Sequence, residues 1–564
     1  MDAKFDAIVV GSGITGGWAA KELTERGLKV LMLERGHPIE HVKDYAGEHQ
    51  NPWDEKFRGQ GDRKRVKEEH PIVHRGAPYA LQEGNQHFWI NEKENPYVSD
   101  PERPFDWFRG GGVGGRSLLW GRQSYRWSDL DFEANAKDGH GVDWPIRYAD
   151  IEPWYDHVEE FIGVSGQAEG LPQLPDSKFL PPMELNCVEK HCREKIAEKF
   201  PGRVVTIGRT AILTKAHNGR AACHYCGPCH MGCSTGSYFS TQSSTLPAAQ
   251  ATGRLLVRSD AVVEGIEFDP ESKRATGVRV IDAKTGGRET IPTRLVFLCA
   301  STVGSTQILL NSRSERAPDG LANSSGSLGR YLMDHHLGLS AVGLMPGFDQ
   351  QDTFGRRPNG IYIARFKNLG DEASKAPFLR GYGYQGRAQR TGWEMGNMLP
   401  GFGKQLKETL RKPGPWTIGL SGFGECLPNE ANQITLDETK VDAFGIPQVR
   451  VSMAFGENER KMREDAAEEA AAMIVAAGGV VMAKAADLST PGVAIHEMGT
   501  ARMGRDPKTS VLNAHNQAHD VPNLFVTDGA CMTSSACQNP SLTYMALTAR
   551  AAAYAASEME KGSI

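Results

Sequence analysis

The stretch Ala7-Ile8-Val9-Val10-Gly11-Ser12-Gly13-Ile14-Thr15-Gly16 decides the fold. Its four apolar residues predict a buried strand, and its glycines form a GxGxxG turn. An amphipathic helix is expected to follow as far as Arg26, and a second strand from Lys29 to Leu33. Strand, glycine turn, helix and strand make a βαβ unit, which is the opening of a dinucleotide-binding fold.

Each residue of the turn has an expected role. Gly11 makes the turn, Gly13 lets a pyrophosphate approach, and Gly16 packs the helix on the strand. Glu34 ends the second strand, where its carboxylate can accept hydrogen bonds from an adenosine ribose, and Arg35 beside it is assigned to the same site. NAD and FAD share this fingerprint, and a turn that only packs is the alternative.

Bulk properties restrict the class of protein. A chain of 564 residues exceeds one hydrophobic core and predicts about three domains, or two large interleaved ones. The net charge is −5, so the strongly basic balance typical of a nucleic-acid binder is missing and nucleic acid is not expected as a partner. The residues before the first strand lack the pattern of a secretory signal, so no export signal is expected. The longest apolar run, 470–483, is broken by two glycines and is shorter than the ~20 residues of a membrane span, so no transmembrane segment is expected.

The remaining chain predicts a second, sheet-based domain. Residues 41–104 are polar and irregular, which is typical of a cap. Alternating apolar and polar residues then favour antiparallel strands near 338–345, 360–366, 378–386, 417–426, 432–437 and 447–454. Residues 523–530 and an alanine-rich helix at 541–559 have a sequence pattern like that of the first domain and are assigned to it.

The predicted fold class is therefore α/β, or α+β overall. A Rossmann-like cofactor domain is assembled from discontinuous segments, and a substrate domain has a mostly antiparallel sheet. The expected boundaries are 1–40, 105–335 and 491–564 for the cofactor domain, 41–104 for the cap, 336–490 for the substrate domain, and 215–240 for a cysteine-containing insertion.

A second glycine tract, Gly110 to Ser117, can bring backbone against a broad flat ring, although a loop without chemical consequence is the alternative. With the first turn and several later motifs, this tract resembles the glucose-methanol-choline (GMC) oxidoreductase family. The motifs are Val113-Gly114-Gly115-Arg116-Ser117, Ala300-Ser301-Thr302-Val303-Gly304-Ser305, Gly329-Arg330-Tyr331-Leu332-Met333-Asp334-His335, His496-Glu497-Met498-Gly499-Thr500-Ala501-Arg502-Met503-Gly504 and Asn539-Pro540-Ser541-Leu542-Thr543. The resemblance spans nearly the whole chain, in order.

The resemblance implies FAD, a flavin domain and a sheet-based substrate domain. Asp528 and Gly529 resemble the family's contact to the cofactor pyrophosphate. The other cofactor contacts that we assign are Gly114, Gly115, Ser117, Val263, Ser301 and Asn539. Some sugar-oxidising relatives bind FAD covalently through a histidine two residues after the serine of the second glycine motif. That position is Leu119 here, so a dissociable flavin is expected.

Alcohol oxidation by a flavin needs a base for the hydroxyl proton, and a neutral imidazole suits this role. Composition cannot select one of 17 histidines, but the resemblance implies His496 as the base. It also implies Asn539 as the partner that hydrogen-bonds the substrate oxygen, because an amide donates and accepts without titrating. Asp334, with His335 and His336 after it, is interpreted as structural.

Four of the ten cysteines, Cys223, Cys226, Cys229 and Cys233, follow C-x2-C-x2-C-x3-C, the spacing of bacterial ferredoxins, with Ser234 in place of the usual proline. Structural zinc is the alternative, but its paired cysteines are normally farther apart. The chain also resembles a GMC branch, the FAD-dependent glucose and glucoside 3-dehydrogenases, which carry an iron–sulfur cluster. Three-iron clusters there use the spacing of Cys223, Cys229 and Cys233, so 3Fe-4S is favoured over 4Fe-4S.

This branch implies further partners. A small subunit with a twin-arginine signal often exports such catalytic subunits, which would place a chain without its own signal in the periplasm. Electrons would then leave to cytochrome c or another acceptor. Two other hypotheses stay open: an oxygen-using pyranose oxidase with structural zinc, and a flavin-binding relay subunit without chemistry of its own.

Overall fold

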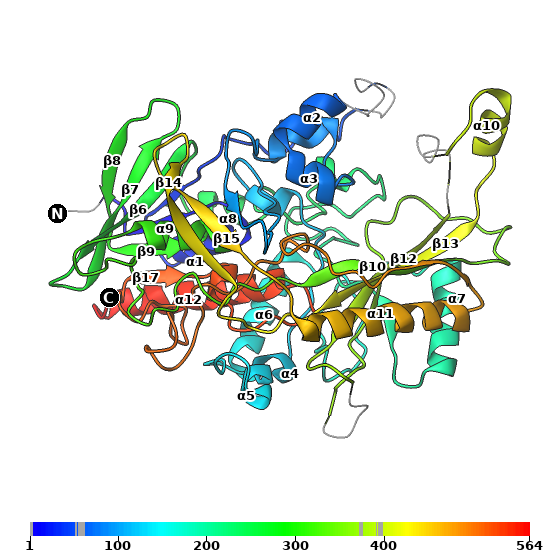
Figure 1. The fold of residues 1–564 in the computed structure, drawn as a ribbon. Coiled ribbons are helices and arrows are strands. Elements are labelled where there is room, and N and C mark those ends of the chain that lie inside the picture. Colours follow the sequence, from blue (N-terminus) through cyan, green and yellow to red (C-terminus); the bar gives the residue numbers. More distant parts are fainter. Residues whose placement is uncertain (1–3, 51–53, 55–61, 371–375, 391, 393–398) are drawn as a thin grey trace.

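The computed structural model describes residues 4–50, 54, 62–370, 376–390, 392 and 399–564 (Figure 1). A parallel sheet with helices around it forms one end of the molecule, and a larger antiparallel sheet forms the other (Figure 1). The predicted mixed α/β class, with parallel and antiparallel sheets in separate units, is confirmed.

The parallel sheet is built from segments far apart in the sequence. Its order is β17 (Leu524–Val526), β9 (Leu295–Leu298), β1 (Ala7–Val10), β2 (Val30–Leu33) and β5 (Leu255–Arg258). Every residue of β1, β2 and β9 is buried, as parallel strands covered on both faces require. The first βαβ unit thus lies at the centre of the sheet.

Helices from both ends of the chain cover this sheet. The glycine turn leads into α1 (Ile14–Glu25), which packs against α8 (Thr245–Ala251) and α12 (Ser541–Glu560). The alanine-rich face of α12 lets α1 and α6 (Tyr148–Ile162) approach closely. The C-terminal helix therefore lies beside the N-terminal one (Figure 1).

An antiparallel sheet forms the second unit, the part of the chain that the sequence pattern assigns to the substrate. Its order is β16 (Val480–Lys484), β10 (His336–Leu344), β13 (Trp416–Gly424), β12 (Tyr382–Arg390), β11 (Ile361–Ile363) and β4 (Val205–Ile207). The long helix α11 (Glu457–Ala476) packs on β10, β13 and β16, and α7 (Cys187–Lys199) packs on α11 (Figure 1).

The apolar run 470–483 is the end of α11, a turn at Gly478, where φ is +77°, and β16. The run is thus divided between a helix and a strand, and the two glycines that break it lie between them. Within the described ranges, none of the helices has the length and hydropathy that a membrane crossing would need.

Two small sheets complete the structure. One has the order β6 (Ala261–Asp269), β7 (Arg274–Asp282) and β8 (Arg288–Pro292), and the other β14 (Gln433–Val441), β15 (Pro447–Ser452) and β3 (Val98–Ser99). The sheets cross the expected domain boundaries. Strand β4, from the expected cofactor segment, joins the substrate sheet, and β3, from the expected cap, pairs with β15.

The remaining elements are short helices. In the expected cap, part of which lies outside the described residues, they are α2 (Arg63–Glu69), α3 (Pro71–Gly76) and η2 (Glu83–Phe88). Elsewhere they are η3 (Gly115–Leu118), α4 (Asp129–Phe132), α5 (Ala134–Asp138), η4 (Cys229–Met231), α9 (Thr302–Asn311), α10 (Gly403–Leu410) and η6 (Gly529–Cys531).

Candidate functional site

The three glycines of the first turn have different surroundings. Gly11 has φ +97°, and a Cβ there would lie 2.4 Å from the carbonyl oxygen of Cys299. A Cβ on Gly16 would lie 2.0 Å from the Gly11 carbonyl, so helix and turn touch through backbone. At Gly13 a Cβ would meet no atom within 4 Å. The turn is therefore tight at Gly11 and Gly16 and open at Gly13, where a phosphate group has room to approach.

Glu34 lies against this turn. Its carboxylate accepts hydrogen bonds from the Ser12 backbone N–H at 3.0 Å, the Ser12 hydroxyl at 2.5 Å and the Gly36 N–H at 2.8 Å. The Glu34 carbonyl accepts from Ala261 at 2.9 Å, which brings β6 and Val263 to the same end of the sheet. These contacts fix the acid beside the glycine turn.

Arg35 points elsewhere. Its guanidinium donates to Asn95 at 3.3 Å and pairs with Asp442 at 3.1 Å. The side chain of Arg35 thereby links the end of β2 to the expected cap and to the β14–β15 loop. It does not point toward Glu34, which it follows in the sequence.

The second glycine tract lies directly on the first. The Gly114 N–H donates to the Ser12 hydroxyl at 2.9 Å, and the nearest atom to a Cβ on Gly115 would be the Gly13 Cα, at 3.6 Å. Ser117 donates to the Gly114 carbonyl at 2.6 Å. Two glycine tracts a hundred residues apart thus form one backbone surface.

Three further loops meet at Glu497. Arg116 holds its carboxylate through two hydrogen bonds, of 3.0 and 2.7 Å. The Glu497 carbonyl accepts from the Thr302 hydroxyl at 2.5 Å, and a Cβ on Gly529 would lie 2.2 Å from that carbonyl. The loops that carry Ser117, Ser301, Asp528 and His496 therefore converge.

Asp528 and Ser301 occupy the start of helices. Asp528 caps η6 by accepting from the Ala530 N–H at 3.0 Å, and its second oxygen accepts from the Ser305 hydroxyl. Burial raises the pKa of Asp528 to about 6. Ser301, before α9, has φ +70°, a left-handed conformation that is rare for a residue with a side chain.

The loop of His496 is held by Asp334. One carboxylate oxygen of Asp334 accepts from the His496 N–H at 3.0 Å, and the other accepts from Gly492 at 2.7 Å and Ala494 at 3.3 Å. Burial and the charge of Glu497 raise the pKa of Asp334 to about 7. Asp334 thus shapes the loop that presents His496.

His496 has a polar partner at each ring nitrogen. Asn539 Nδ2 lies 3.2 Å from its Nε2, and Nδ1 of His335 lies 2.7 Å from its Nδ1. The amide oxygen of Asn539 accepts from Gln385 at 2.5 Å. Burial, together with the charges of His335 and Arg116, lowers the pKa of His496 well below its ordinary value. This shift favours the neutral imidazole form of His496.

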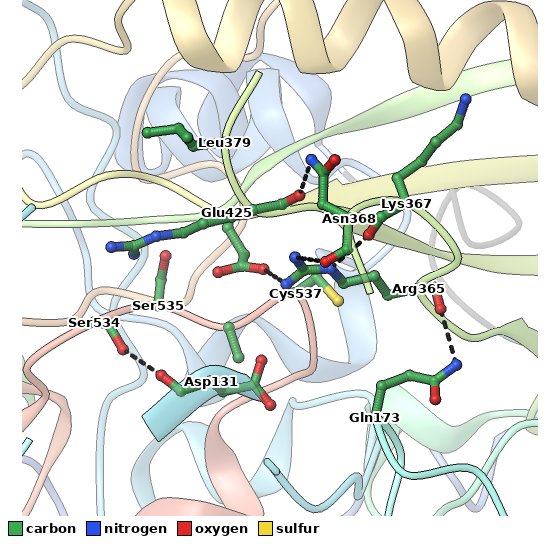
Figure 2. Close-up of polar contacts among 12 residues, drawn as sticks. Asp131, Gln173, Arg365, Lys367, Asn368, Leu379, Glu425, Ser534, Ser535 and Cys537 are labelled. Atoms are coloured by element: carbon green, nitrogen blue, oxygen red, sulfur yellow. Dashed lines mark hydrogen bonds and ion pairs between the residues drawn. The ribbon is translucent and has the colours of Figure 1, made fainter. Parts of the chain in front are cut away.

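The segment before Asn539 is anchored by its own side chains, which bind backbone groups of neighbouring elements (Figure 2). Ser535 exchanges two hydrogen bonds of 2.9 Å with the Cys426 backbone, and Gln538 donates to the Gln173 carbonyl at 3.1 Å. A buried ion pair of 2.7 Å between Arg365 and Glu425 lies beside Cys537 (Figure 2). These contacts hold the Asn539 backbone in place.

The four clustered cysteines all line one small hollow, together with Tyr238 and Arg356. No disulfide joins them. In the described part of the chain, no three Cys, His, Asp or Glu side chains converge closely enough to hold a single metal ion.

A buried cation lies between this hollow and the glycine tracts. Arg122 is fully buried, and its guanidinium donates to the carbonyls of Ser117 at 3.1 Å, Leu118 at 3.2 Å and Phe239 at 3.3 Å, and to that of Trp120. All four of these acceptors are backbone carbonyls. Burial lowers its pKa, while negative charge on Cys229 or Cys233 would oppose that shift. A buried guanidinium whose hydrogen-bond acceptors within the described residues are neutral carbonyls would be stabilised by a nearby anion.

Leu119, between these loops, is buried in an apolar cluster with Leu118, Phe88 and Phe108. Its side chain offers no nucleophile for a bond to flavin.

This fold and these glycine loops are those of a dinucleotide-binding oxidoreductase. GMC oxidoreductase family models match residues 5–337 and 428–548, most of the chain. The chain belongs to the GMC oxidoreductase family, which implies FAD as cofactor and an alcohol as substrate.

Curated relatives include enzymes for small alcohols and for sugars. The chain is 30% identical to 2-methyl-1,2-propanediol dehydrogenase of Mycolicibacterium austroafricanum, covering 97% of this chain and 94% of the relative. It is 25% identical to the fructose dehydrogenase large subunit of Gluconobacter japonicus, covering 99% and 98%. It is also 25% identical to the gluconate 2-dehydrogenase flavoprotein of Pantoea cypripedii, covering 97% and 92%.

Solved structures share the fold. A pyridoxine 4-oxidase from Mesorbium loti superimposes with a TM-score of 0.61 at 15% identity, covering 97% of this chain and 98% of the other. A formate oxidase from Aspergillus oryzae gives a TM-score of 0.61 at 14% identity, covering 99% of both.

Sequence reasoning overlooked two neighbours of the candidate pair. His335 was assigned a structural role with Asp334, yet its ring contacts His496. Its place inside a family-like motif is a signal that could have drawn attention to it. Nothing in the sequence singles out Gln385, which reaches Asn539 from β12.

Proposed function

We propose that the chain is an FAD-dependent dehydrogenase that oxidises a secondary alcohol of a sugar, with glucose or a glucoside as substrate and C3 as the carbon. The observation that carries this proposal is the 3.2 Å contact between His496 Nε2 and Asn539 Nδ2, both on loops that adjoin the glycine tracts. The pair keeps exposed fractions of only 9% and 8%, so a substrate hydroxyl can reach it while bulk water is largely excluded.

The two residues have complementary tasks. His496 Nε2 takes the hydroxyl proton of the substrate, and its neutral state suits a base. Asn539 donates to the same hydroxyl oxygen and keeps it next to His496, and Gln385 holds the Asn539 amide in orientation. Bound FAD supplies the acceptor for the hydrogen that leaves the carbinol carbon as hydride.

The glycine turn supports FAD binding by this chain. The open side of Gly13 gives a pyrophosphate room, and the adjoining N-terminal end of α1 favours its negative charge. Glu34 is positioned to exchange its hydrogen bond with the Ser12 hydroxyl for one from a ribose. Asp528, Gly529 and the second glycine tract would hold the remainder of the cofactor.

We also propose an iron–sulfur cluster, 3Fe-4S in preference to 4Fe-4S, in the cysteine hollow. The support for a cluster is that all four cysteines line one hollow and that their C-x2-C-x2-C-x3-C spacing is that of bacterial ferredoxins, whereas the paired cysteines of a structural zinc site are normally farther apart in the sequence. A negatively charged cluster would also compensate the buried Arg122, which adjoins the Ser117 loop.

Such a cluster implies an external electron acceptor. Cytochrome c or another acceptor would take them, and a small subunit with a twin-arginine signal would carry the chain to the periplasm. The names of two relatives, a fructose dehydrogenase large subunit and a gluconate 2-dehydrogenase flavoprotein, support a sugar-type substrate and a multi-subunit enzyme.

Metal and sulfide analysis of the purified protein tests the electron-transfer part of this proposal. We expect iron and acid-labile sulfide in comparable amounts. Zinc without sulfide would contradict the cluster and favour an oxygen-using oxidase. Anaerobic bleaching of the flavin by a panel of sugars and small diols tests the substrate, and bleaching by a diol but by no sugar would contradict it.

A further inference from the structure

A second histidine is linked to the candidate base. The rings of His335 and His496 meet edge to face, with centroids 4.9 Å apart, and their Nδ1 atoms are 2.7 Å apart. The other nitrogen of His335, Nε2, contacts the carbonyl oxygen of Ala536. His335 is therefore placed between a backbone carbonyl and His496.

The carbonyl determines where His335 carries its proton. A carbonyl oxygen can only accept, so His335 Nε2 must be the N–H that donates to Ala536. A neutral imidazole carries one N–H, which leaves Nδ1 of His335 as an acceptor. His335 is fully buried, and burial lowers its pKa to about 4, so the neutral form is the relevant one.

The tautomer of His335 determines the tautomer of His496. Two unprotonated nitrogens cannot form a hydrogen bond, so the contact of 2.7 Å requires the proton on His496 Nδ1. His496 Nε2 is then unprotonated and accepts from Asn539 Nδ2. A donor chain thus runs in one direction from Gln385 through Asn539, His496 and His335 to the Ala536 carbonyl.

We propose that His335 is a positioning residue that fixes His496 in the Nδ1–H tautomer and so keeps Nε2 free as the base. This inference rests on the proposed function only for its catalytic consequence, because the tautomer itself is a property of the resting protein. His335 touches neither substrate nor reacting atoms, and it acts through His496.

The tautomer can be measured without turnover. In the FAD-loaded protein labelled with [15N]histidine, long-range proton–nitrogen correlation spectra distinguish Nδ1–H from Nε2–H, and the missing signals of His496→Ala identify His496. We expect the proton of His496 on Nδ1. A proton on Nε2 in the unaltered protein would overturn the proposal.

Two matched variants test the consequence. In His335→Asn the amide oxygen takes the place of the Nδ1 acceptor, whereas in His335→Gln the amide nitrogen takes the place of Nε2 and the acceptor is lost. We expect the Gln variant to move the proton of His496 to Nε2 and to slow flavin reduction about 10²-fold. The Asn variant should retain the tautomer and most of the rate, with equal FAD content in both.

The outcomes separate the two proposals. Equal rates for the Gln variant and the unaltered protein would overturn the role of His335. A correct tautomer in a protein whose flavin no alcohol reduces would leave this inference standing and refute the proposed function.

Discussion

The amide nitrogen of Asn539 lies 3.2 Å from Nε2 of His496, and its amide oxygen accepts from Gln385. Because Gln385 holds the oxygen, the NH2 group faces His496 and the position where a substrate hydroxyl would bind. The contact joins β12 of the substrate sheet to two loops of the cofactor unit.

Asn539→Ala should slow flavin reduction, because the substrate oxygen loses the donor that places it beside His496. Asn539→Asp should be slower still, because a carboxylate cannot donate and would accept the proton of an Nε2–H tautomer of His496. Stopped-flow reduction under anaerobic conditions measures both rates. Gln173→Ala, which loses only its side-chain contact to the Arg365 carbonyl, serves as the control. An unchanged rate in Asn539→Ala would refute the positioning role.

The rate of flavin reduction should not follow the ordinary titration of a histidine. The folded protein lowers the pKa of His496, so the base stays neutral as the pH falls through about 6.5, the ordinary value for histidine. The rate should therefore be flat there and fall only at lower pH. A pH series of single-turnover rates checks this, and a half-point at or above about 6.5 would contradict it.

The flavin should dissociate on denaturation. Leu119 occupies the position where some relatives carry a flavin-binding histidine, and its buried side chain cannot form that bond. Acid precipitation should release all yellow colour into the supernatant. Colour that stays with the pellet would reveal a covalent link.

The cysteines should differ in importance. If three irons are held by Cys223, Cys229 and Cys233, Cys226→Ser should leave iron content and electron transfer largely intact. Cys229→Ser should abolish transfer to an external acceptor while sugar still bleaches the flavin. Cys187→Ser, a cysteine outside the hollow, is the matched control.

Electron paramagnetic resonance distinguishes the two cluster types. A signal in the protein as isolated is expected for three irons. A silent protein that gains its signal on reduction by dithionite would instead indicate four irons, with Cys226 as a ligand.

Much of the fold could be predicted because its signals are local. The apolar run 7–10, the glycines after it and the alanine-rich helix near the C-terminus carry their structure in adjacent residues. The sheet partners of β3 and β4 could not be predicted, because their short strands join segments hundreds of residues away or in the other unit.

In the candidate site, too, residues in recognisable motifs could be predicted, whereas residues brought together only by folding could not. His496 and Asn539 were predicted as a pair through family-like motifs, and their side chains do meet. Of the partners that orient them, His335 lies in a family-like motif that does not reveal its contact with His496, and Gln385 lies in β12, where nothing in the sequence singles it out. Arg122 likewise resembles any surface arginine until folding buries it beside the cysteines.

The most direct test of the central claim is anaerobic stopped-flow reduction of the flavin by glucose and glucosides in the unaltered protein and in His496→Ala. Removing a general base costs on the order of 10²–10⁴-fold in rate. We predict rapid bleaching by a sugar in the unaltered protein and a loss of that size in the variant, with FAD still bound. Near-normal bleaching of His496→Ala at saturating sugar would contradict the account.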